Sequence, residues 1–154
     1  MSIEIQHLSK TFFPGTSREH KALKNVSLLI REGDFITIVG GNGAGKSTFL
    51  NAIAGNFSLD EGTISFGGHQ IEHTADFERA AYISRVFQDP MQGTAPRMTV
   101  AENLALANRR GQKRSLFKTS SKEELQQFEA LLAPLGLGLE DRLHTEIGLL
   151  SGGQ

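Results

Sequence analysis

Gly40-Gly41-Asn42-Gly43-Ala44-Gly45-Lys46-Ser47 matches the pattern G-x-x-x-x-G-K-[ST], which is typical of phosphate-binding loops. The apolar run Phe35–Val39 leads into it and predicts a strand buried on both faces, as in a parallel sheet. After it, Phe49 and Ile53 recur at helical spacing, and Gly55 is placed to end that helix. The sequence therefore predicts the strand, loop and helix order that a phosphate cradle needs.

Each part of this loop has a chemical role in the prediction. Glycines allow successive backbone N–H groups to point at phosphate oxygens, and the following helix N-terminus adds partial positive charge. Lys46 would supply a full charge to the β- and γ-phosphates, and Ser47 a hydroxyl oxygen to Mg²⁺. The alternative is a glycine-rich turn that binds nothing. The predicted nucleotide-binding residues are Gly40, Gly41, Asn42, Gly43, Ala44, Gly45, Lys46, Ser47 and Thr48.

The composition limits the class of protein. The 154 residues carry a net charge of −1 and are 38% hydrophobic, which excludes wholesale disorder and a polyanion-coating protein. The chain has no cysteine, which excludes disulfides, Cys-ligated zinc and a thiol nucleophile. No apolar run approaches the roughly 20 residues that span a bilayer, and the N-terminus lacks a signal-peptide pattern. These features predict a soluble cytoplasmic protein.

The first third of the chain favours β-structure and the last third α-structure. Strands are predicted where Ile3, Ile5 and His7 alternate with polar residues, and at Ala22–Ile30, Thr63–Phe66 and Ile83–Phe87. Thr99 with Glu102, and Ser121 with Glu124, have the spacing of helix N-terminal capping boxes. The second predicted helix carries one apolar stripe, ended by Gly136: Leu125, Phe128, Leu131, Leu132 and Leu135.

Two further patterns have competing interpretations. His69-Gln70-Ile71-Glu72-His73 matches an inverted zinc-protease pattern, but Gly67 and Gly68 before it disfavour the helix that such a site requires. Two exposed histidines, with Ile71 buried in a strand, are therefore predicted. The stretch from Arg109 to Lys122 is rich in Lys and Arg, which suits either a phosphate-binding patch or a solvated loop. We predict the loop, and no nucleic-acid partner, because the net charge is not basic.

The pentapeptide Leu150-Ser151-Gly152-Gly153-Gln154, together with the phosphate-binding loop, resembles the nucleotide-binding domain of the ATP-binding cassette (ABC) family. The resemblance extends along the chain. Thr11-Phe12 looks like the family's adenine-stacking loop, Phe87–Pro90 looks like its Q-loop, and Thr99–Leu104 resembles the start of its helical subdomain.

The resemblance implies a role for several residues. Phe12 would stack on adenine, a role for which Phe13 competes. Gln88 would offer its carbonyl oxygen to Mg²⁺ or to the attacking water, so that Ser47 and Gln88 are the implied metal ligands. The segment Leu150, Ser151, Gly152, Gly153 and Gln154 would form a second anion site, closing over ATP held by the other subunit of a head-to-tail dimer.

The implied fold is α/β: a P-loop NTPase core with a mixed sheet and N-terminal antiparallel strands, plus part of the ABC helical subdomain. The core with P-loop and Q-loop would occupy residues 1–95, and the helical subdomain residues 96–154. Family members continue with an acidic strand and a switch histidine, which this sequence does not contain. We therefore expect an incomplete domain without its catalytic glutamate, which binds Mg-ATP and is inactive alone.

The function implied is that of an ATP-binding ABC transporter subunit, with ATP and Mg²⁺ as cofactors. Ser84–Pro96 resembles importer-type ATPases, whose partners are transmembrane permease subunits, a second ATPase subunit and a solute-binding protein. Such a subunit would be cytoplasmic and peripheral at the inner face of the membrane, without direct insertion. A soluble non-transport ABC ATPase and a nucleotide-binding remnant without hydrolysis are the alternatives.

Overall fold

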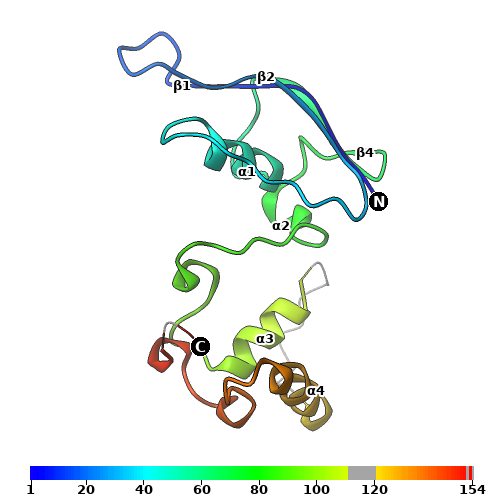
Figure 1. Cartoon of the computed structure of the whole chain (residues 1–154), viewed down its shortest axis with the longest axis vertical. Coiled ribbons are helices and arrows are strands. Elements are labelled where there is room, and N and C mark those ends of the chain that lie inside the picture. Colours follow the sequence, from blue (N-terminus) through cyan, green and yellow to red (C-terminus); the bar gives the residue numbers. More distant parts are fainter. Residues whose placement is uncertain (111–120, 152, 154) are drawn as a thin grey trace. The chain divides into compact units, whose positions relative to one another are not determined.

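A computed structural model describes residues 1–110, 121–151 and 153 of the chain (Figure 1). They form two compact units, Met1–Ile83 and Ser84–Gln154, which are described separately.

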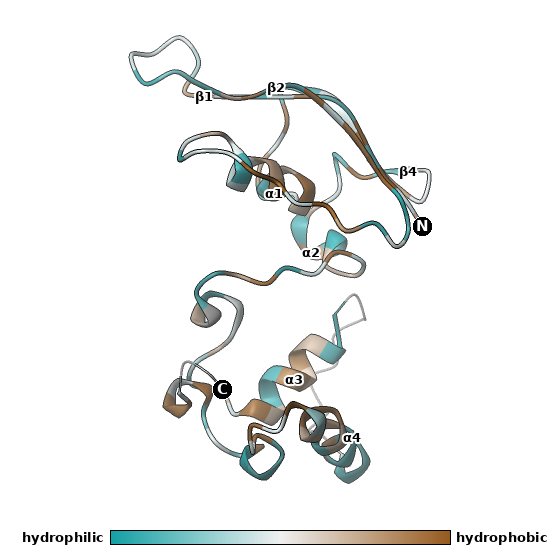
Figure 2. Ribbon diagram, viewed as in Figure 1, coloured by the Kyte–Doolittle hydropathy of each residue, from teal (hydrophilic) through white to brown (hydrophobic). Residues whose placement is uncertain are grey.

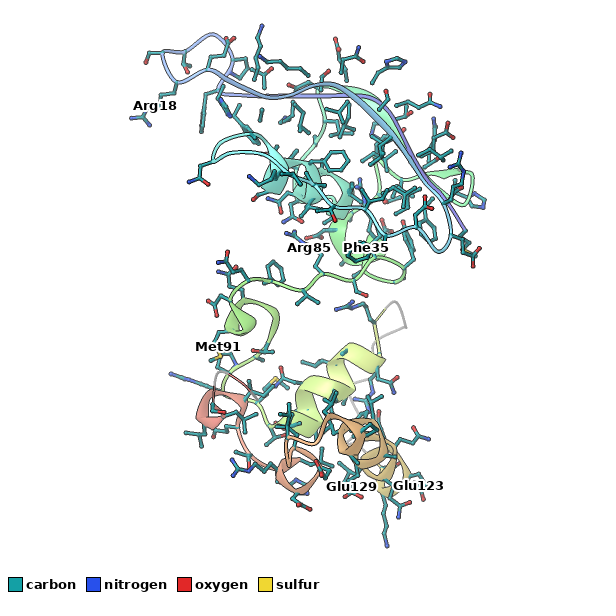
Figure 3. All side chains as sticks on the ribbon, in the orientation of Figure 1. Arg18, Phe35, Arg85, Met91, Glu123 and Glu129 are labelled. Atoms are coloured by element: carbon teal, nitrogen blue, oxygen red, sulfur yellow. The ribbon has the colours of Figure 1, made fainter. Side chains whose placement is uncertain are left out.

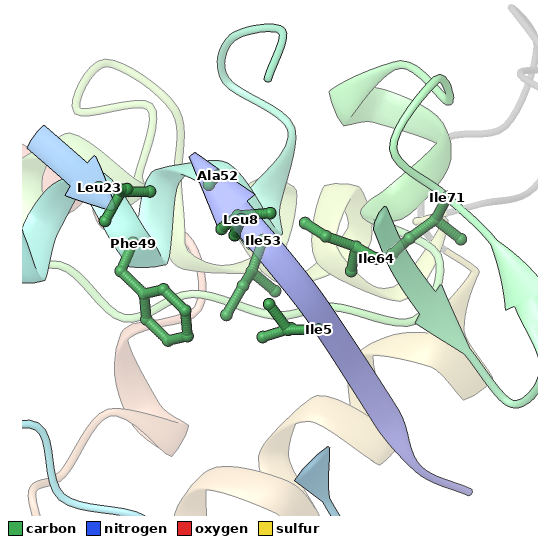
Figure 4. Close-up of a cluster of buried hydrophobic side chains, with 8 residues drawn as sticks. All are labelled: Ile5, Leu8, Leu23, Phe49, Ala52, Ile53, Ile64 and Ile71. Atoms are coloured by element: carbon green, nitrogen blue, oxygen red, sulfur yellow. The ribbon is translucent and has the colours of Figure 1, made fainter. Parts of the chain in front are cut away.

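The first unit is an antiparallel sheet packed on a helix. Its strands are β1 (Ile3–Phe12), β2 (His20–Ile30), β3 (Glu61–Phe66) and β4 (His69–Gln70), in the order β2-β1-β3-β4. The helices are α1 (Lys46–Ala54) and the short α2 (Asp76–Arg79). Figure 4 shows the core that joins sheet and helix: Ile5, Leu8, Leu23, Phe49, Ala52, Ile53, Ile64 and Ile71. The strands predicted near Ile3, at Ala22–Ile30 and at Thr63–Phe66 are therefore confirmed.

A bulge interrupts the alternation predicted for the first strand. His7 is exposed and has a left-handed backbone (φ 53°), and Leu8 is buried in its place. Asn25 on β2 is also left-handed (φ 51°), and its side-chain oxygen lies 2.7 Å from His7 Nδ1. On the other side of β1, a Cβ on Gly62 would lie 2.5 Å from the Gln6 carbonyl oxygen. The bulge thus shifts the inward face of β1 by one residue.

Two of the predicted strands are wrong. Phe35–Val39 and Ile83–Phe87 are not strands, because neither segment pairs with another strand anywhere in the described chain. Phe35, labelled in Figure 3, is 95% exposed, Val39 88% and Val86 99%, although each is strongly apolar. Figure 2 shows hydrophobic colouring along the segment that joins β2 to α1. A strand exists through hydrogen bonds to a neighbour, so an apolar run alone does not make one.

The second unit is helical. It contains α3 (Val100–Asn108), α4 (Lys122–Leu132) and four 3₁₀ turns, η1 (Pro90–Gly93), η2 (Ala133–Leu135), η3 (Glu140–Arg142) and η4 (Ile147–Leu149). Its core comprises Val100, Ala101, Ala105, Phe128, Leu132, Leu139 and Leu143. Leu131 and Leu135 of the predicted apolar stripe are instead exposed, at 63% and 58%. The stripe is thus narrower than predicted.

The helix starts agree with the predicted capping signals. Thr99 Oγ1 accepts from Glu102 N at 3.2 Å, and Glu102 Oε2 accepts from Thr99 N at 2.8 Å. Ser121 Oγ accepts from Glu124 N at 3.2 Å. These contacts satisfy N–H groups that have no acceptor within the helix. The predicted basic stretch from Arg109 to Lys122 lies largely outside the described residues, because these do not include 111–120.

Candidate nucleotide-binding site

The glycine loop and the start of α1 form a concentrated set of free backbone donors. Gly43 and Gly45 have φ of 79° and 84°, and Ala44 N donates to Gly41 O at 3.3 Å, so the loop curls on itself. The first helical bond is Phe49 N to Gly45 O at 2.8 Å. Gly45 is the N-cap, and no side chain of the described residues caps this end. The first-turn N–H groups are therefore available to an anion.

The position of this loop is set by contact with β2. A Cβ on Gly45 would lie 2.4 Å from the Ala22 carbonyl oxygen and 3.5 Å from the Leu23 side chain. The loop backbone thus touches the strand that pairs with β1, where Phe12 lies opposite His20. Only glycine allows this approach together with a positive φ.

The Lys46 side chain folds back over the glycine loop that precedes it. Its Nζ donates to Gly40 O and to Gly41 O, both at 2.7 Å. The ammonium group is therefore held above the loop by carbonyl oxygens, which are weaker partners for a cation than a phosphate. The first turn of α1 contains no acidic residue. This end of the helix therefore combines a full positive charge, the helix dipole and no competing carboxylate.

The opposite end of α1 is held by an arginine that the sequence pattern did not single out. Arg79 is only 2% exposed, and its Nη1 donates to Ala52 O at 3.0 Å and Ile53 O at 2.9 Å. Its Nε lies 3.2 Å from Thr74 O, and a Cβ on Gly55 would lie 2.8 Å from that nitrogen. Burial lowers the pKa of Arg79, but an arginine remains charged in proteins. It therefore complements the negative end of the helix dipole.

A cavity of about 400 Å³ lies beside the loop, between β2, α1 and the segment 36–39. Its lining includes Leu23, Val26, Ile36, Ile38 and Phe49. These side chains cannot pair with phosphate oxygens. Ala44, Gly45 and Lys46 line the end of the cavity next to the loop. We therefore place the candidate anion site at that end, at the loop N–H groups and Lys46, and not along the apolar walls.

Phe12 is packed within a small cluster at the end of β1. Its ring centroid lies 5.4 Å from that of Phe57, with the ring planes at 78°. Lys10 Nζ lies 5.7 Å from the Phe12 centroid and 5.6 Å from that of Phe57. Phe13, the competing candidate, is 63% exposed and has a left-handed backbone (φ 53°). Phe12 is thus the phenylalanine held in place by its surroundings.

The other predicted site residues belong to the second unit. Gln88 is exposed. Leu150 packs against the helical core, and Ser151 and Gly153 are exposed, whereas Gly152 and Gln154 lie outside the described residues. The segment before Leu150 pairs with the loop 95–99, through Ile147 N to Met98 O at 3.1 Å and Gly148 N to Pro96 O at 2.9 Å.

Asn103, which the sequence pattern did not select as a site residue, holds that loop. Its Oδ1 accepts from Ala95 N at 2.8 Å, and its Nδ2 lies within 3.2 Å of the carbonyl oxygens of Ala95, Met98 and Thr99. One amide side chain therefore holds the loop 95–99, with which the segment before Leu150 pairs.

The histidine pattern does not lie on a helix. His69 is in β4, His73 follows the buried Ile71, and α2 begins only at Asp76. Because the two histidines do not share a helical face, the zinc-protease geometry is not met. Among the described residues, no group of three or more His, Cys, Asp or Glu is arranged to hold a metal ion.

This geometry, a curled glycine loop feeding an uncapped helix start with a lysine over it, is that of a P-loop NTPase domain. A family model described as "ABC transporter" matches residues 23–154. The chain is 39% identical over 152 residues to the tyrosine transport ATP-binding protein of Clostridioides difficile (strain R20291), covering 99% of this chain and 60% of that protein. The chain belongs to the ABC transporter family of ATP-binding proteins.

Other similar proteins agree with this assignment. The sn-glycerol-3-phosphate import ATP-binding protein UgpC of Brucella abortus (strain 2308) is 40% identical over 136 residues, which cover 87% of this chain and 35% of that protein. A dimeric ATP-binding cassette solved in a post-hydrolysis state with ADP and Pi has a TM-score of 0.77 and 31% identity, covering 99% of this chain and 64% of its own. The expected fold class is thus confirmed. The chain spans about 60% of the first relative and 35% of the second.

None of the described helices combines the length and the apolar character needed to cross a membrane.

Proposed function

We propose that this chain is the nucleotide-binding part of an ABC transporter ATPase subunit, with ATP and Mg²⁺ as its ligands. The observation that carries the proposal is the uncapped start of α1, with Lys46 Nζ 2.7 Å from two loop carbonyls. Phosphates would bind the loop at Gly40–Thr48 and replace the carbonyls of Gly40 and Gly41 as partners of the Lys46 ammonium group. Ser47, on the first turn of α1, is exposed and would offer its hydroxyl to Mg²⁺, with Gln88 as the second proposed ligand.

The partners follow from the relatives. We propose an importer-type assembly, because the similar proteins include a transport ATP-binding protein and an import ATP-binding protein. The chain would pair head to tail with a second ATPase subunit, as the dimeric cassette supports, with Leu150, Ser151, Gly152, Gly153 and Gln154 facing the partner's nucleotide. Permease subunits and a solute-binding protein complete the proposed assembly, at the cytoplasmic face of the membrane.

The proposal for this chain is limited to binding. The family hydrolyses ATP, as the post-hydrolysis cassette with ADP and Pi illustrates. We assign no catalytic glutamate among the carboxylates of residues 1–154, so Gln88 has only a supporting role. We propose the division into a core of residues 1–95 and a helical subdomain of residues 96–154 on the same resemblance.

The test is titration of the purified chain with Mg-ATP by calorimetry. Lys46→Ala removes a charged hydrogen-bonding partner of phosphate, which is worth about 1.5–3 kcal/mol, or roughly 10- to 150-fold in Kd. The double variant His69→Ala and His73→Ala is the control and is expected to bind as the wild type does. Wild-type affinity in Lys46→Ala, or stoichiometric zinc in the purified protein, would contradict the proposal.

A further inference from the structure

The segment between α1 and β3 is attached to the end of β1 through one carboxylate. Asp60 Oδ2 accepts from Thr11 N at 2.6 Å, and Asp60 Oδ1 accepts from Lys10 Nζ at 2.8 Å. The backbone joins in, since Asp60 N donates to Ser9 O at 3.1 Å. One residue therefore binds three consecutive positions at the end of β1.

The same two segments also meet through their aromatic rings. Phe57 and Phe12 pack at 78° with centroids 5.4 Å apart, and Lys10 Nζ lies near both rings. The Lys10 side chain is only 15% exposed, so the ion pair with Asp60 is partly shielded from water. Hydrogen bonds from Lys10 and from Thr11 N–H lower the pKa of the Asp60 carboxyl, which is therefore ionised at neutral pH.

We infer that Asp60 is a positioning residue that holds Phe12 at a fixed place relative to the phosphate-binding loop. This rests on the proposed function, in which Phe12 stacks on the base while the loop binds the phosphates. Asp60 lies six positions beyond Ala54, the last residue of α1, and the loop lies at the other end of that helix. The Asp60 contacts therefore connect the base platform to the rigid element that carries the phosphate site.

The energetic reason is preorganisation. A nucleotide gains stacking only if the ring already stands where the base arrives, and ordering a loose ring during binding reduces the affinity. Base stacking on an aromatic side chain is worth about 1–3 kcal/mol. Because Phe12 would keep its other contacts, we expect only part of this to be lost without Asp60, about 3- to 10-fold in the Kd for ATP.

Tripolyphosphate separates this role from a general structural one. It uses the loop and Lys46 but has no base, so its affinity does not depend on Phe12. Removing a negative charge near an anion site can only strengthen phosphate binding through the direct field. Weaker ATP binding with unchanged or tighter tripolyphosphate binding is therefore a specific result. Neither the loss of the Asp60 negative charge nor a general loosening of the fold would produce it.

The experiment compares ATP and tripolyphosphate titrations of the 154-residue chain with Mg²⁺, and follows quenching of etheno-ATP fluorescence as a signature of stacking. The variants are Asp60→Ala, Asp60→Asn and Lys10→Met. Asp60→Asn keeps an oxygen acceptor for Thr11 N, so it protects the test if Asp60→Ala does not fold. Glu61→Gln, at the exposed neighbouring position, is the matched control for loss of one negative charge.

We expect selective loss of ATP affinity and of etheno-ATP quenching in the Asp60 and Lys10 variants, and wild-type behaviour in Glu61→Gln. Equal loss of ATP and tripolyphosphate, or unchanged ATP affinity, would overturn the inference while leaving the proposed function intact. A wild-type chain that binds neither ligand would overturn both.

Discussion

The close approach of Gly45 to β2 predicts that alanine at position 45 destabilises the fold more than alanine at position 43, which serves as the control. Both residues have a positive φ, 84° and 79°, so alanine at either position adopts a left-handed backbone at a cost of about 1–2 kcal/mol. They differ in their surroundings: a Cβ on Gly45 would lie 2.4 Å from Ala22 O, whereas one on Gly43 meets nothing within 4 Å.

The difference between the two variants measures the contact alone. Relieving an overlap at 2.4 Å requires the loop or β2 to shift by more than half an ångström, and overpacking of this kind costs about 1–3 kcal/mol. We expect Gly43→Ala to lower the free energy of unfolding by about 1–2 kcal/mol and Gly45→Ala by about 2–5 kcal/mol.

Urea unfolding of the nucleotide-free chain, followed by far-UV circular dichroism, provides the comparison. The free chain is used because alanine in the loop also obstructs phosphate, which would mix binding with stability. The slope with urea should be the same for both variants, so that midpoints can be compared directly. Equal destabilisation by the two substitutions, within about 0.5 kcal/mol, would refute the packing of the loop on Ala22.

Other predictions concern the base platform, the buried arginine and the acid limb of stability. Phe12→Ala should weaken ATP and GTP alike, by about 5- to 150-fold, in competition titrations; if Phe13→Ala does this instead, the assignment is off by one. Arg79→Leu should lower the free energy of unfolding by about 3 kcal/mol, because it leaves buried carbonyls at the end of α1 without donors. Arg79→Lys should recover part of that stability, and no recovery would contradict the helix-dipole contribution. The pKa of Asp60 is lower in the folded than in the unfolded chain, so its contribution is present at neutral pH. That contribution is lost as the pH falls below about 4. In Asp60→Asn, the free energy of unfolding should therefore fall less steeply in acid than in the wild type. An unchanged acid dependence would contradict the ion pair of Asp60 with Lys10.

Features set within a few residues were predictable from the sequence. The glycine loop, the start of α1 and its end at Gly55 follow from local backbone preferences. The N-caps at Thr99 and Ser121 follow from side chains that reach N–H groups three positions away. Each of these requires no partner from elsewhere in the chain, so a sequence pattern is sufficient evidence.

Features that depend on a distant partner were not predictable in the same way. The apolar run Phe35–Val39 has the composition of a buried strand, yet a strand needs a neighbour, and the described residues provide none. The bulge at His7 exists together with the left-handed Asn25 on the adjacent strand, and neither residue indicates it alone.

By itself, then, the sequence determined the residues of the candidate phosphate site, because one loop and one helix end contain every donor proposed for it. Tertiary structure decided what holds that candidate site: Ala22 against Gly45, Arg79 at the far end of α1, and Asp60 bonded to Thr11, next to the proposed base-stacking residue Phe12. These partners lie 23 to 51 positions from what they contact, as the pairs Gly45–Ala22 and Asp60–Ser9 illustrate. At that separation the contact exists only once the sheet has paired and α1 has packed on it, and no local pattern indicates it.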